Sequence, residues 1–191
     1  MEYDLYDFDK TIYQKDCTVE FWKYCIRRKP LVLIALPVQA IGAVLMKLKK
    51  SKSGKSLVLS FIRFVDAEKL VPAFWKENEK YINSWFLPQN RERPAVVCSA
   101  SPEFILDGIC KKLEVERLVA TIADPKTGKL QSPNCKGREK PVRLSEFYDL
   151  SVFHDVYSDS VSSDLPILKL GKNAFKVEAG GKLVKINVNN V

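Results

Sequence analysis

Three short segments of this chain place acidic or hydroxyl side chains directly after strand-like runs, and this pattern constrains the fold most. The segments are residues 7–11, 98–101 and 157–164. Carboxylates gathered at strand ends repel one another unless a cation or a reaction uses them. The pattern therefore predicts strands that bring the three segments to one site, where a bound partner offsets the negative charge.

The order of apolar runs and helical patterns predicts an α/β protein. Strands are expected at 3–7, 95–98, 115–123, 152–157 and 174–178, and helices at 103–113, 138–149 and 164–170. Alternating strands and helices are typical of a parallel sheet. We therefore expect a Rossmann-like parallel sheet core with helices on both faces, formed by residues 1–13 and 94–191.

Residues 14–93 carry mostly helical signals, which predicts an all-helical cap inserted after the first strand. A helix over 19–26 is expected to begin after Thr18, a suitable N-cap residue. The stretch 66–86 spaces its apolar residues at three- and four-residue intervals, as an amphipathic helix does. The cap is therefore expected to be a separate helical domain.

The net charge of +8 is concentrated in this predicted cap. Between Lys23 and Lys55 there are nine basic residues and no acidic residue, whereas the rest of the chain has 22 basic and 23 acidic residues. A localised basic segment favours an anionic partner. We expect residues 23–55 to contact an anionic membrane surface, and we expect no specific nucleic acid partner.

The cysteines and the histidine limit the chemistry. The five cysteines form no Cys-x-x-Cys pair, and the first strand begins close to Met1 without room for a cleavable leader. A reduced cytoplasmic protein is expected, peripheral at the inner face of the membrane if the basic segment binds there. The single histidine, His154, is interpreted as structural, which leaves oxygen ligands for any metal, as Mg²⁺ or Ca²⁺ prefers.

Four motifs carry a resemblance to a known family. They are DFDKT at 7–11, SAS at 99–101, the lysine-containing segment 134–140 and SDSVSSD at 158–164. Their order and spacing resemble the haloacid dehalogenase superfamily, and the insertion after the first motif is similar to that of its phosphoserine-phosphatase-like branch. Lys10 stands where many members have Gly, and four residues separate Asp159 from Asp164 where many relatives have three.

The resemblance implies a role for each acid. Asp7 would be the nucleophile that forms an aspartyl-phosphate. Asp9, two residues later, would protonate the leaving oxygen and then deprotonate the hydrolytic water. Mg²⁺ would be held by the carboxylates of Asp7 and Asp159 and by the carbonyl of Asp9. Asp164 and Ser160 would lie beside these ligands.

Other residues are expected to bind the phosphoryl group or the substrate. Ser99, Ala100 and the amides at the start of the next helix can hold phosphoryl oxygens, because helix N-termini bind anions. Lys140 is expected to supply the fixed positive charge, with Lys136 as the alternative. Asp16 falls where phosphoserine phosphatases carry a substrate-reading Glu; it is equally interpreted as an acid at a helix start.

The uncharged segment 31–46 has two interpretations. It is shorter than the roughly 20 residues of a spanning helix, and Pro37 interrupts it. It is either a buried hairpin of cap helices or an interfacial segment whose flanking Lys and Arg meet anionic headgroups. The run Arg-Arg-Lys-Pro before it, with the later Tyr-Ser-Asp-Ser, is similar to the phosphatidylglycerophosphatase C type within the branch.

These observations predict a Mg²⁺-dependent phosphomonoester hydrolase that acts on a phosphorylated small molecule or a lipid phosphate. Phosphatidylglycerophosphate is the lipid substrate that the last similarity implies. The alternatives are a soluble phosphatase of phosphoserine or sugar phosphates, a phosphotransferase with an acceptor other than water, and a non-catalytic protein that binds anionic surfaces.

Overall fold

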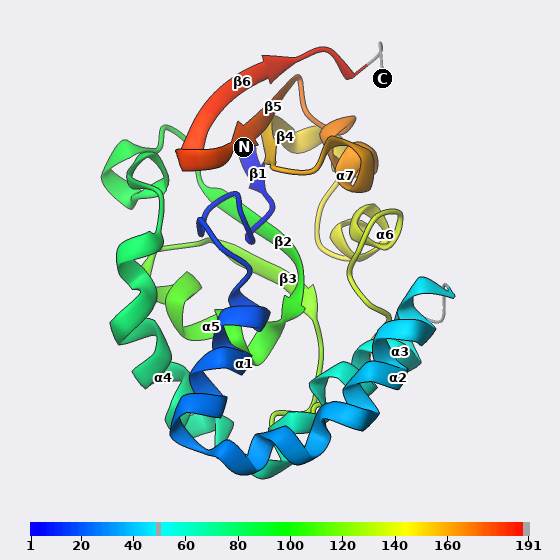
Figure 1. The fold of residues 1–191 in the computed structure, drawn as a ribbon. Coiled ribbons are helices and arrows are strands. Elements are labelled where there is room, and N and C mark those ends of the chain that lie inside the picture. Colours follow the sequence, from blue (N-terminus) through cyan, green and yellow to red (C-terminus); the bar gives the residue numbers. More distant parts are fainter. Residues whose placement is uncertain (49–50, 189–191) are drawn as a thin grey trace.

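In the computed structural model, which describes residues 1–48 and 51–188, the chain forms a six-stranded sheet in the order β3-β2-β1-β4-β5-β6 (Figure 1). The strands are β1 (Tyr3–Tyr6), β2 (Ala95–Pro102), β3 (Arg117–Thr121), β4 (Phe153–Ser158), β5 (Asn173–Glu178) and β6 (Lys182–Ile186). Neighbours from β3 to β5 pair in parallel, and β6 pairs antiparallel with β5. The α/β fold is confirmed; β6 was not predicted.

The strand order places β1 in the middle of the sheet, at the point where the order reverses. From β1 the chain builds β2 and β3 on one side, and then returns to build β4 and β5 on the other side. In open α/β sheets, ligands bind where the strand order reverses in this way. The segments that follow β1, β2 and β4 therefore meet at one edge of the sheet, as their sequences predicted.

Side chains alternate between two cores, one on each face of the sheet. Tyr6 and Val97 belong to one core, whereas Leu5 and Val96 belong to the other. The helices of the carboxyl-terminal half are α5 (Glu103–Lys112), α6 (Glu139–Ser145) and α7 (Val161–Leu168). The first core includes residues of α5, and the second includes residues of α6 and α7. Figure 1 shows these helices on opposite sides of the sheet.

Between β1 and β2 the chain is helical, as expected. The α-helices are α1 (Cys17–Arg28), α2 (Leu36–Lys47), α3 (Ser51–Val58) and α4 (Ala67–Asn78). The 3₁₀ segments are η1 (Pro30–Ala35), η2 (Leu59–Phe64), η3 (Glu79–Tyr81), η4 (Ser84–Phe86) and η5 (Pro88–Asn90). Much of this insertion shares the first core with α5 and one face of the sheet. Its division from the rest at residues 14 and 93 stays a prediction.

The structure corrects the bounds of two helices in the insertion. Asp16, not Thr18, is the N-cap of α1, and its side chain accepts a hydrogen bond of 2.9 Å from the backbone N–H of Val19. The helix expected over 66–86 ends at Asn78 and continues as 3₁₀ turns. Asn83 lies between two of these turns, and its side-chain amide donates to the carbonyl oxygen of Thr11 at 2.7 Å.

The carboxyl-terminal helices also differ from expectation. The helix predicted over 138–149 is the shorter α6, which is followed by a turn and by η6 (Leu150–Val152). Asp149 lies beyond the end of α6, and its carboxylate accepts a hydrogen bond from the N–H of Ser151 and so caps η6. The helix predicted over 164–170 is α7, which begins earlier, inside the acidic segment 158–164. A last 3₁₀ turn, η7 (Ala179–Gly181), joins β5 to β6.

The helices α2 and α3 form a tight hairpin. A Cβ atom built on Gly42 would lie 2.6 Å from the carbonyl oxygen of Gly54, so only glycine allows this approach. Gln39 strengthens the crossing, since its side-chain amide donates to the carbonyl oxygen of Val58 at 2.9 Å. The predicted hairpin is therefore present.

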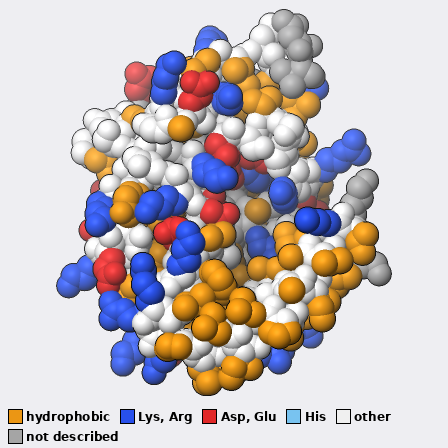
Figure 2. Space-filling model, viewed as in Figure 1, with side chains coloured by type: hydrophobic (Ala, Val, Ile, Leu, Met, Phe, Trp, Pro, Cys, Tyr) orange, Lys and Arg blue, Asp and Glu red, His pale blue; other side chains and the backbone are white. Residues whose placement is uncertain are grey.

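The hairpin is not buried, which corrects one of the two interpretations of residues 31–46. Eight large apolar residues of η1, α2 and the residue after α2 are exposed, and we call them the apolar surface: Leu31, Leu33, Ile34, Leu36, Val38, Ile41, Val44 and Leu48. Figure 2 shows hydrophobic side chains gathered over the lower part of the molecule, where this segment runs. The sequence did not reveal this, because apolar content alone does not say whether a helix is covered.

Within the described residues, Pro30–Lys47 is the one helical stretch that is long and apolar enough to cross a membrane, with 18 residues, a mean hydropathy of 1.8 and 17% of its residues buried. Its packing argues against a spanning position. The α3 helix lies against it and carries Lys52, Lys55 and several serines. A polar partner helix of this kind is expensive to place in hydrocarbon.

The loop 124–130 gives a first test of the fold. Gly128 has a φ of +71°, and a Cβ atom built on it would lie 2.1 Å from the carbonyl oxygen of Leu59. Gly128→Ala is therefore expected to lower the free energy of unfolding by about 2–4 kcal/mol, measured by urea denaturation. Gly108→Ala is the control: a Cβ atom on Gly108 meets nothing within 4 Å in α5, so this change should stabilise by about 0.5–1 kcal/mol. Equal stability of the two variants would contradict this account of the loop.

Candidate active site

The ends of β1, β2 and β4 surround a polar cavity of about 250 Å³, which we call the active-site cavity. Its lining is mostly acidic and basic: Asp7, Asp9, Lys10, Asp16, Ala100, Lys136, Lys140, Asp159, Ser160, Ser163 and Asp164. Eight of the nine predicted site residues are among them. The backbone draws β1 and β4 together up to this point, because the N–H of Asp7 donates to the carbonyl oxygen of Tyr157 at 2.9 Å.

Lys140 lies at the centre of the charged groups. Its ammonium is 2.7 Å from Oδ1 of Asp7 and 2.8 Å from Oδ2 of Asp164, and its side chain is only 2% exposed. Ser158 donates a further hydrogen bond of 2.8 Å to Oδ2 of Asp164. Lys136 lines the cavity without an ion pair to a described acid. Of the two candidate lysines, Lys140 is thus the one fixed against Asp7.

Burial and neighbouring charges shift the pKa values of these groups in a consistent direction. Burial raises the pKa of Asp7 to about 7, although the nearby Lys140 acts in the opposite direction. Burial alone would lower the pKa of Lys140, but Asp7 and Asp164 outweigh it and raise that pKa. Lys140 therefore stays positively charged. Any further positive charge beside Asp7 would stabilise its ionised form.

Asp9 is held by groups from α1 and β2. Its Oδ1 accepts a hydrogen bond of 2.6 Å from the N–H of Cys17, and its Oδ2 accepts one of 2.5 Å from the hydroxyl of Ser101. Burial raises the pKa of this carboxyl, and Asp16 adds to the rise. Asp9 is thus oriented on both sides, and its raised pKa brings it closer to the range in which a carboxyl group can donate a proton.

Lys10 occupies a backbone conformation that explains why many relatives have Gly at this position. Its φ of +58° lies in the left-handed region, which glycine adopts without strain. Thr11 follows, and its hydroxyl accepts a hydrogen bond of 2.9 Å from the N–H of Asp159. The turn after β1 is therefore tied to the loop after β4 by this contact.

The two aspartates of the acidic segment after β4, Asp159 and Asp164, lie in different surroundings. Asp159 lines the cavity directly after the strand, and burial raises its pKa while Lys10 lowers it. Asp164 lies in the first turn of α7 and is 4% exposed, with its carboxylate on Lys140. Ser160 lines the cavity between them and precedes α7 as its N-cap residue.

Ser99 is the predicted residue that does not line the cavity. It is 1% exposed, and its hydroxyl accepts a hydrogen bond of 3.1 Å from the N–H of Ser101. The next residue, Ala100, lines the cavity instead. Ser99 therefore holds the shape of the loop in this structure, and it can reach a phosphoryl oxygen only if its hydroxyl turns.

Sequence reasoning missed Lys55, which reaches the site from the helical insertion. Its ammonium donates a hydrogen bond of 2.5 Å to the carbonyl oxygen of Ala100. Burial lowers its pKa, whereas Asp9 and Asp16 raise it, which places this cation close to both acids. No sequence signal separates Lys55 from the eight other basic residues of its segment. Asp16, in turn, both caps α1 and lines the cavity, so both of its interpretations remain open.

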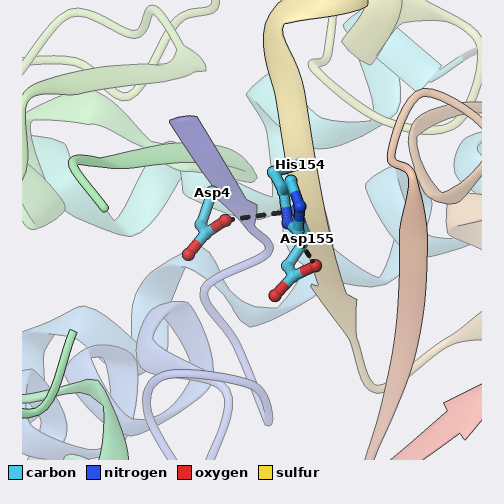
Figure 3. A group of neighbouring side chains, drawn as sticks. All are labelled: Asp4, His154 and Asp155. Atoms are coloured by element: carbon cyan, nitrogen blue, oxygen red, sulfur yellow. Dashed lines mark hydrogen bonds and ion pairs between the residues drawn. The ribbon is translucent and has the colours of Figure 1, made fainter. Parts of the chain in front are cut away.

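A second group of acids lies elsewhere and serves the fold. Figure 3 shows Asp4, His154 and Asp155, whose possible ligand atoms lie within 4.8 Å of one another. His154 contacts Asp155 at 2.8 Å, and the N–H of Asp155 donates to Asp4 at 3.1 Å. Arg93 neutralises the group, with ion pairs of 3.3 Å to Asp4 and 3.6 Å to Asp155. These pairings fit the structural role expected of His154.

Asp7, Asp9 and Asp159 do not form an equally tight group of carboxylate oxygens among the described residues. The reason is the orientation of Asp9, whose carboxylate is engaged by Cys17 and Ser101. Two carboxylates and one backbone carbonyl thus remain available to a cation. Oxygen donors of this kind suit Mg²⁺, and such a cation would offset the charge of Asp7 and Asp159, whose pKa values burial raises.

The comparison with known families decides the assignment. A family model of haloacid dehalogenase-like hydrolases matches residues 5–169. The chain belongs to this family. The expectation of an enzyme of this superfamily is therefore confirmed. No curated protein gave a significant match.

Solved structures share the fold of this haloacid dehalogenase-like hydrolase. A protein of unknown function from Bordetella pertussis Tohama I has a TM-score of 0.72 at 16% identity, over 91% of this chain and 89% of that one. Phosphoserine phosphatase from T. onnurineus has a TM-score of 0.54 at 18% identity, over 94% and 86%. A phospho-aspartyl intermediate analogue of phosphoserine phosphatase has a TM-score of 0.53 at 17% identity, over 91% and 84%.

Proposed function

We propose that this chain is a Mg²⁺-dependent phosphomonoester hydrolase that acts through an aspartyl-phosphate on Asp7. The observation that carries the proposal is the buried ammonium of Lys140, held 2.7 Å from Asp7 in the cavity that Asp9 and Asp159 also line. A phosphate monoester is already anionic, so its attack by a carboxylate needs fixed positive charge at the reacting group. The resemblance to the haloacid dehalogenase family supports the same chemistry.

In the first step, a carboxylate oxygen of Asp7 attacks phosphorus, and the bond from phosphorus to the ester oxygen breaks. Asp9, whose pKa burial raises, gives its proton to the leaving oxygen. In the second step, Asp9 takes a proton from water, and that water attacks phosphorus. Inorganic phosphate leaves, and the carboxylate of Asp7 is restored on Lys140.

Mg²⁺ would be held by the carboxylates of Asp7 and Asp159 and by the carbonyl oxygen of Asp9, and it would offset the charge that the phosphoryl oxygens share. Lys140 holds Asp7 in place throughout and acts to lower the pKa that burial raises. Ala100 lines the cavity at the end of β2, where a phosphoryl oxygen can be bound. Asp164 positions Lys140 from the other side.

The proposal is tested by hydrolysis of p-nitrophenyl phosphate by the purified chain. Release of phosphate should require Mg²⁺, stop with a chelator and return when Mg²⁺ is restored. Added alcohols should yield no phosphorylated alcohol, which separates a hydrolase from a phosphotransferase. Strong binding of anionic vesicles without turnover of any phosphate ester would instead support the non-catalytic alternative.

For the substrate we propose a lipid phosphate at an anionic membrane surface, with the protein peripheral at the cytoplasmic face. The exposed apolar surface supports this, since Leu31, Ile34, Ile41, Val44 and Leu48 are each more than half exposed. Contiguous apolar residues flanked by Lys and Arg are typical of interfacial helices. Phosphatidylglycerophosphate is the first lipid to test, and a preference for it over soluble esters would bear the proposal out.

A soluble substrate is the second candidate. The phosphoserine phosphatases that share the fold favour it, and Asp16 lines the cavity at the position of their substrate-reading acid. A screen of phosphoserine, sugar phosphates and lipid phosphates distinguishes the two candidates. Turnover of a soluble ester that exceeds turnover of every lipid phosphate would overturn the lipid proposal and leave the catalytic proposal intact.

Lys55 is expected to contribute to substrate binding, because its ammonium faces the cavity acids from the insertion. Lys55→Ala should raise KM for p-nitrophenyl phosphate by about tenfold, the effect of losing one charge-assisted hydrogen bond, with a smaller change in kcat. Lys52→Ala on the same helix is the control, because Lys52 lines a different cavity and makes no bond to Ala100, which Lys55 does. An unchanged KM in Lys55→Ala would contradict this role.

A further inference from the structure

A second cavity of about 600 Å³ lies between the α2–α3 hairpin, η2 and the loop before residue 131, and we call it the apolar cavity. Half of its lining is apolar: Ile34, Ala35, Val38, Leu57, Phe64 and Leu130. The other half is polar: Lys52, Ser53, Ser56, Ser60, Arg63 and Lys129. It shares no residue with the active-site cavity. Its volume falls in the range of small-molecule sites, and the proposed hydrolysis does not use it.

The walls of the apolar cavity are fixed by specific contacts. The hydroxyl of Ser56 accepts a hydrogen bond of 3.0 Å from the N–H of Leu130, which ties α3 to the loop. Gly128 brings the same loop against the backbone of Leu59. On the other side, Gln39 and the glycine crossing hold α2 to α3. The cavity is therefore a built feature of the fold and not a gap between loose segments.

The charges around the apolar cavity are of one sign. Lys52, Arg63 and Lys129 are exposed, and none of them pairs with an acid in the described part of the chain. The hydroxyl of Ser60 is buried in the wall without a hydrogen-bond partner. An apolar interior with three unpaired cations matches a ligand that has an apolar tail and an anionic head.

The apolar cavity opens beside the apolar surface. Ile34 and Val38 belong to both, and they are 61% and 39% exposed. A lipid chain that leaves a bilayer under the apolar surface can therefore enter the cavity along continuous apolar contacts. Figure 2 shows hydrophobic side chains gathered over this lower part of the molecule.

We propose that the apolar cavity binds one acyl chain of an anionic membrane lipid, whose headgroup lies against Lys52, Arg63 and Lys129. This lipid is an anchor and not the substrate, because α3 stands between the two cavities. Lys55 of α3 reaches Ala100 at the active site, whereas Lys52, Ser56 and Leu57 of the same helix line the apolar cavity. The inference extends the proposed membrane contact and does not depend on the catalytic proposal.

The test measures binding of phosphatidylglycerol, a phosphodiester that a phosphomonoesterase does not consume, to the full chain. Native mass spectrometry should show one lipid per chain, with phosphatidylcholine bound at least about tenfold more weakly. Ser60→Phe, which fills the cavity without removing a hydrogen bond, should weaken phosphatidylglycerol binding at least about tenfold. The same variant should keep its turnover of p-nitrophenyl phosphate, which shows that it folds.

Charge reversal gives a second arm. Lys52→Glu combined with Arg63→Glu and Lys129→Glu should abolish the preference for the anionic lipid, whereas Lys69→Glu, an exposed lysine of α4 outside the cavity, should leave it unchanged. A lipid with a photoactivatable acyl chain should label Val38, Leu57 or Leu130 in the unaltered protein. This measurement does not depend on the folding of any variant.

Several results would overturn the proposal. They are equal binding by Ser60→Phe, labelling confined to residues outside the apolar cavity, and a stable dimer that covers the apolar surface and excludes lipid. Asp7→Asn separates the two proposals, since it should lose turnover and still bind phosphatidylglycerol. Loss of lipid binding in a folded Asp7→Asn protein would contradict an anchoring site distinct from the active site.

Discussion

Replacing Asp7 by Asn is expected to lower kcat for phosphate monoesters by more than about a thousandfold. The amide has nearly the same shape as the carboxylate, but it does not attack phosphorus to form an acyl phosphate. Lys140 keeps its second partner, Asp164, at 2.8 Å, so the charged cluster should survive the change. Steady-state turnover of p-nitrophenyl phosphate with Mg²⁺ measures the effect, and circular dichroism checks the fold.

Asp4→Asn is the matched control for this prediction. Asp4 lies on β1, three residues before Asp7, and is similarly buried, at 3% exposed, but it pairs with Arg93 away from the cavity. Burial raises the pKa of its carboxyl as well, so the control separates buried charge from catalytic position. Turnover should persist in Asp4→Asn. Equal losses in both variants would mean that the change acts through the fold and not through chemistry at Asp7.

Replacing Lys140 by Met is expected to damage both activity and stability. Turnover should fall by about a thousandfold, because the fixed positive charge beside the reacting group is lost. The variant also leaves the carboxylates of Asp7 and Asp164 buried without their shared cation. Removing one partner of a buried ion pair typically lowers the free energy of unfolding by about 3–5 kcal/mol.

The stability loss in Lys140→Met should depend on pH. The pKa of Asp7 is already raised to about 7 with Lys140 present. The loss of the Lys140 ammonium raises the pKa of Asp7 further. A folded state with a raised carboxyl pKa binds more protons than the unfolded chain, so its stability falls as the pH rises through that range. Urea denaturation without Mg²⁺ should therefore show a smaller loss at pH 5 than at pH 8.

Lys136→Met is the control, because Lys136 lines the same cavity without a bond to Asp7 or Asp164. Its effect on stability should be below about 1 kcal/mol and should not vary with pH between 5 and 8. If Lys136→Met lost more turnover and stability than Lys140→Met, the assignment of the central cation would be wrong.

The strands that carry the site were predictable because each ends in a polar cluster after an apolar run. Asp7 and Asp159 are each the first residue after a buried strand, and parallel pairing alone brings them to one edge. Asp164 and Lys140 were expected near the site for reasons of resemblance. Their direct ion pair is a property of the folded chain, since it depends on how α6 and α7 pack.

The features that the sequence did not predict depend on tertiary contacts. β6 has a weak strand signal, and it forms because β5 offers it an open edge. Lys55 resembles its basic neighbours until α3 is placed against Ala100. Asp16 caps α1 where Thr18 was expected, because α1 begins two residues earlier than the predicted helix over 19–26. The exposure of the apolar surface likewise follows from the position of the hairpin at the rim of the molecule.

The most direct test is to trap the covalent intermediate. The chain is mixed with a phosphate monoester and Mg²⁺, quenched, and treated with borohydride, which reduces an aspartyl-phosphate to homoserine. Tandem mass spectrometry should find homoserine at position 7 only when substrate and Mg²⁺ are both present. Turnover of the ester with an unmodified Asp7, or with the modification at Asp9 or Asp159 instead, would contradict the account.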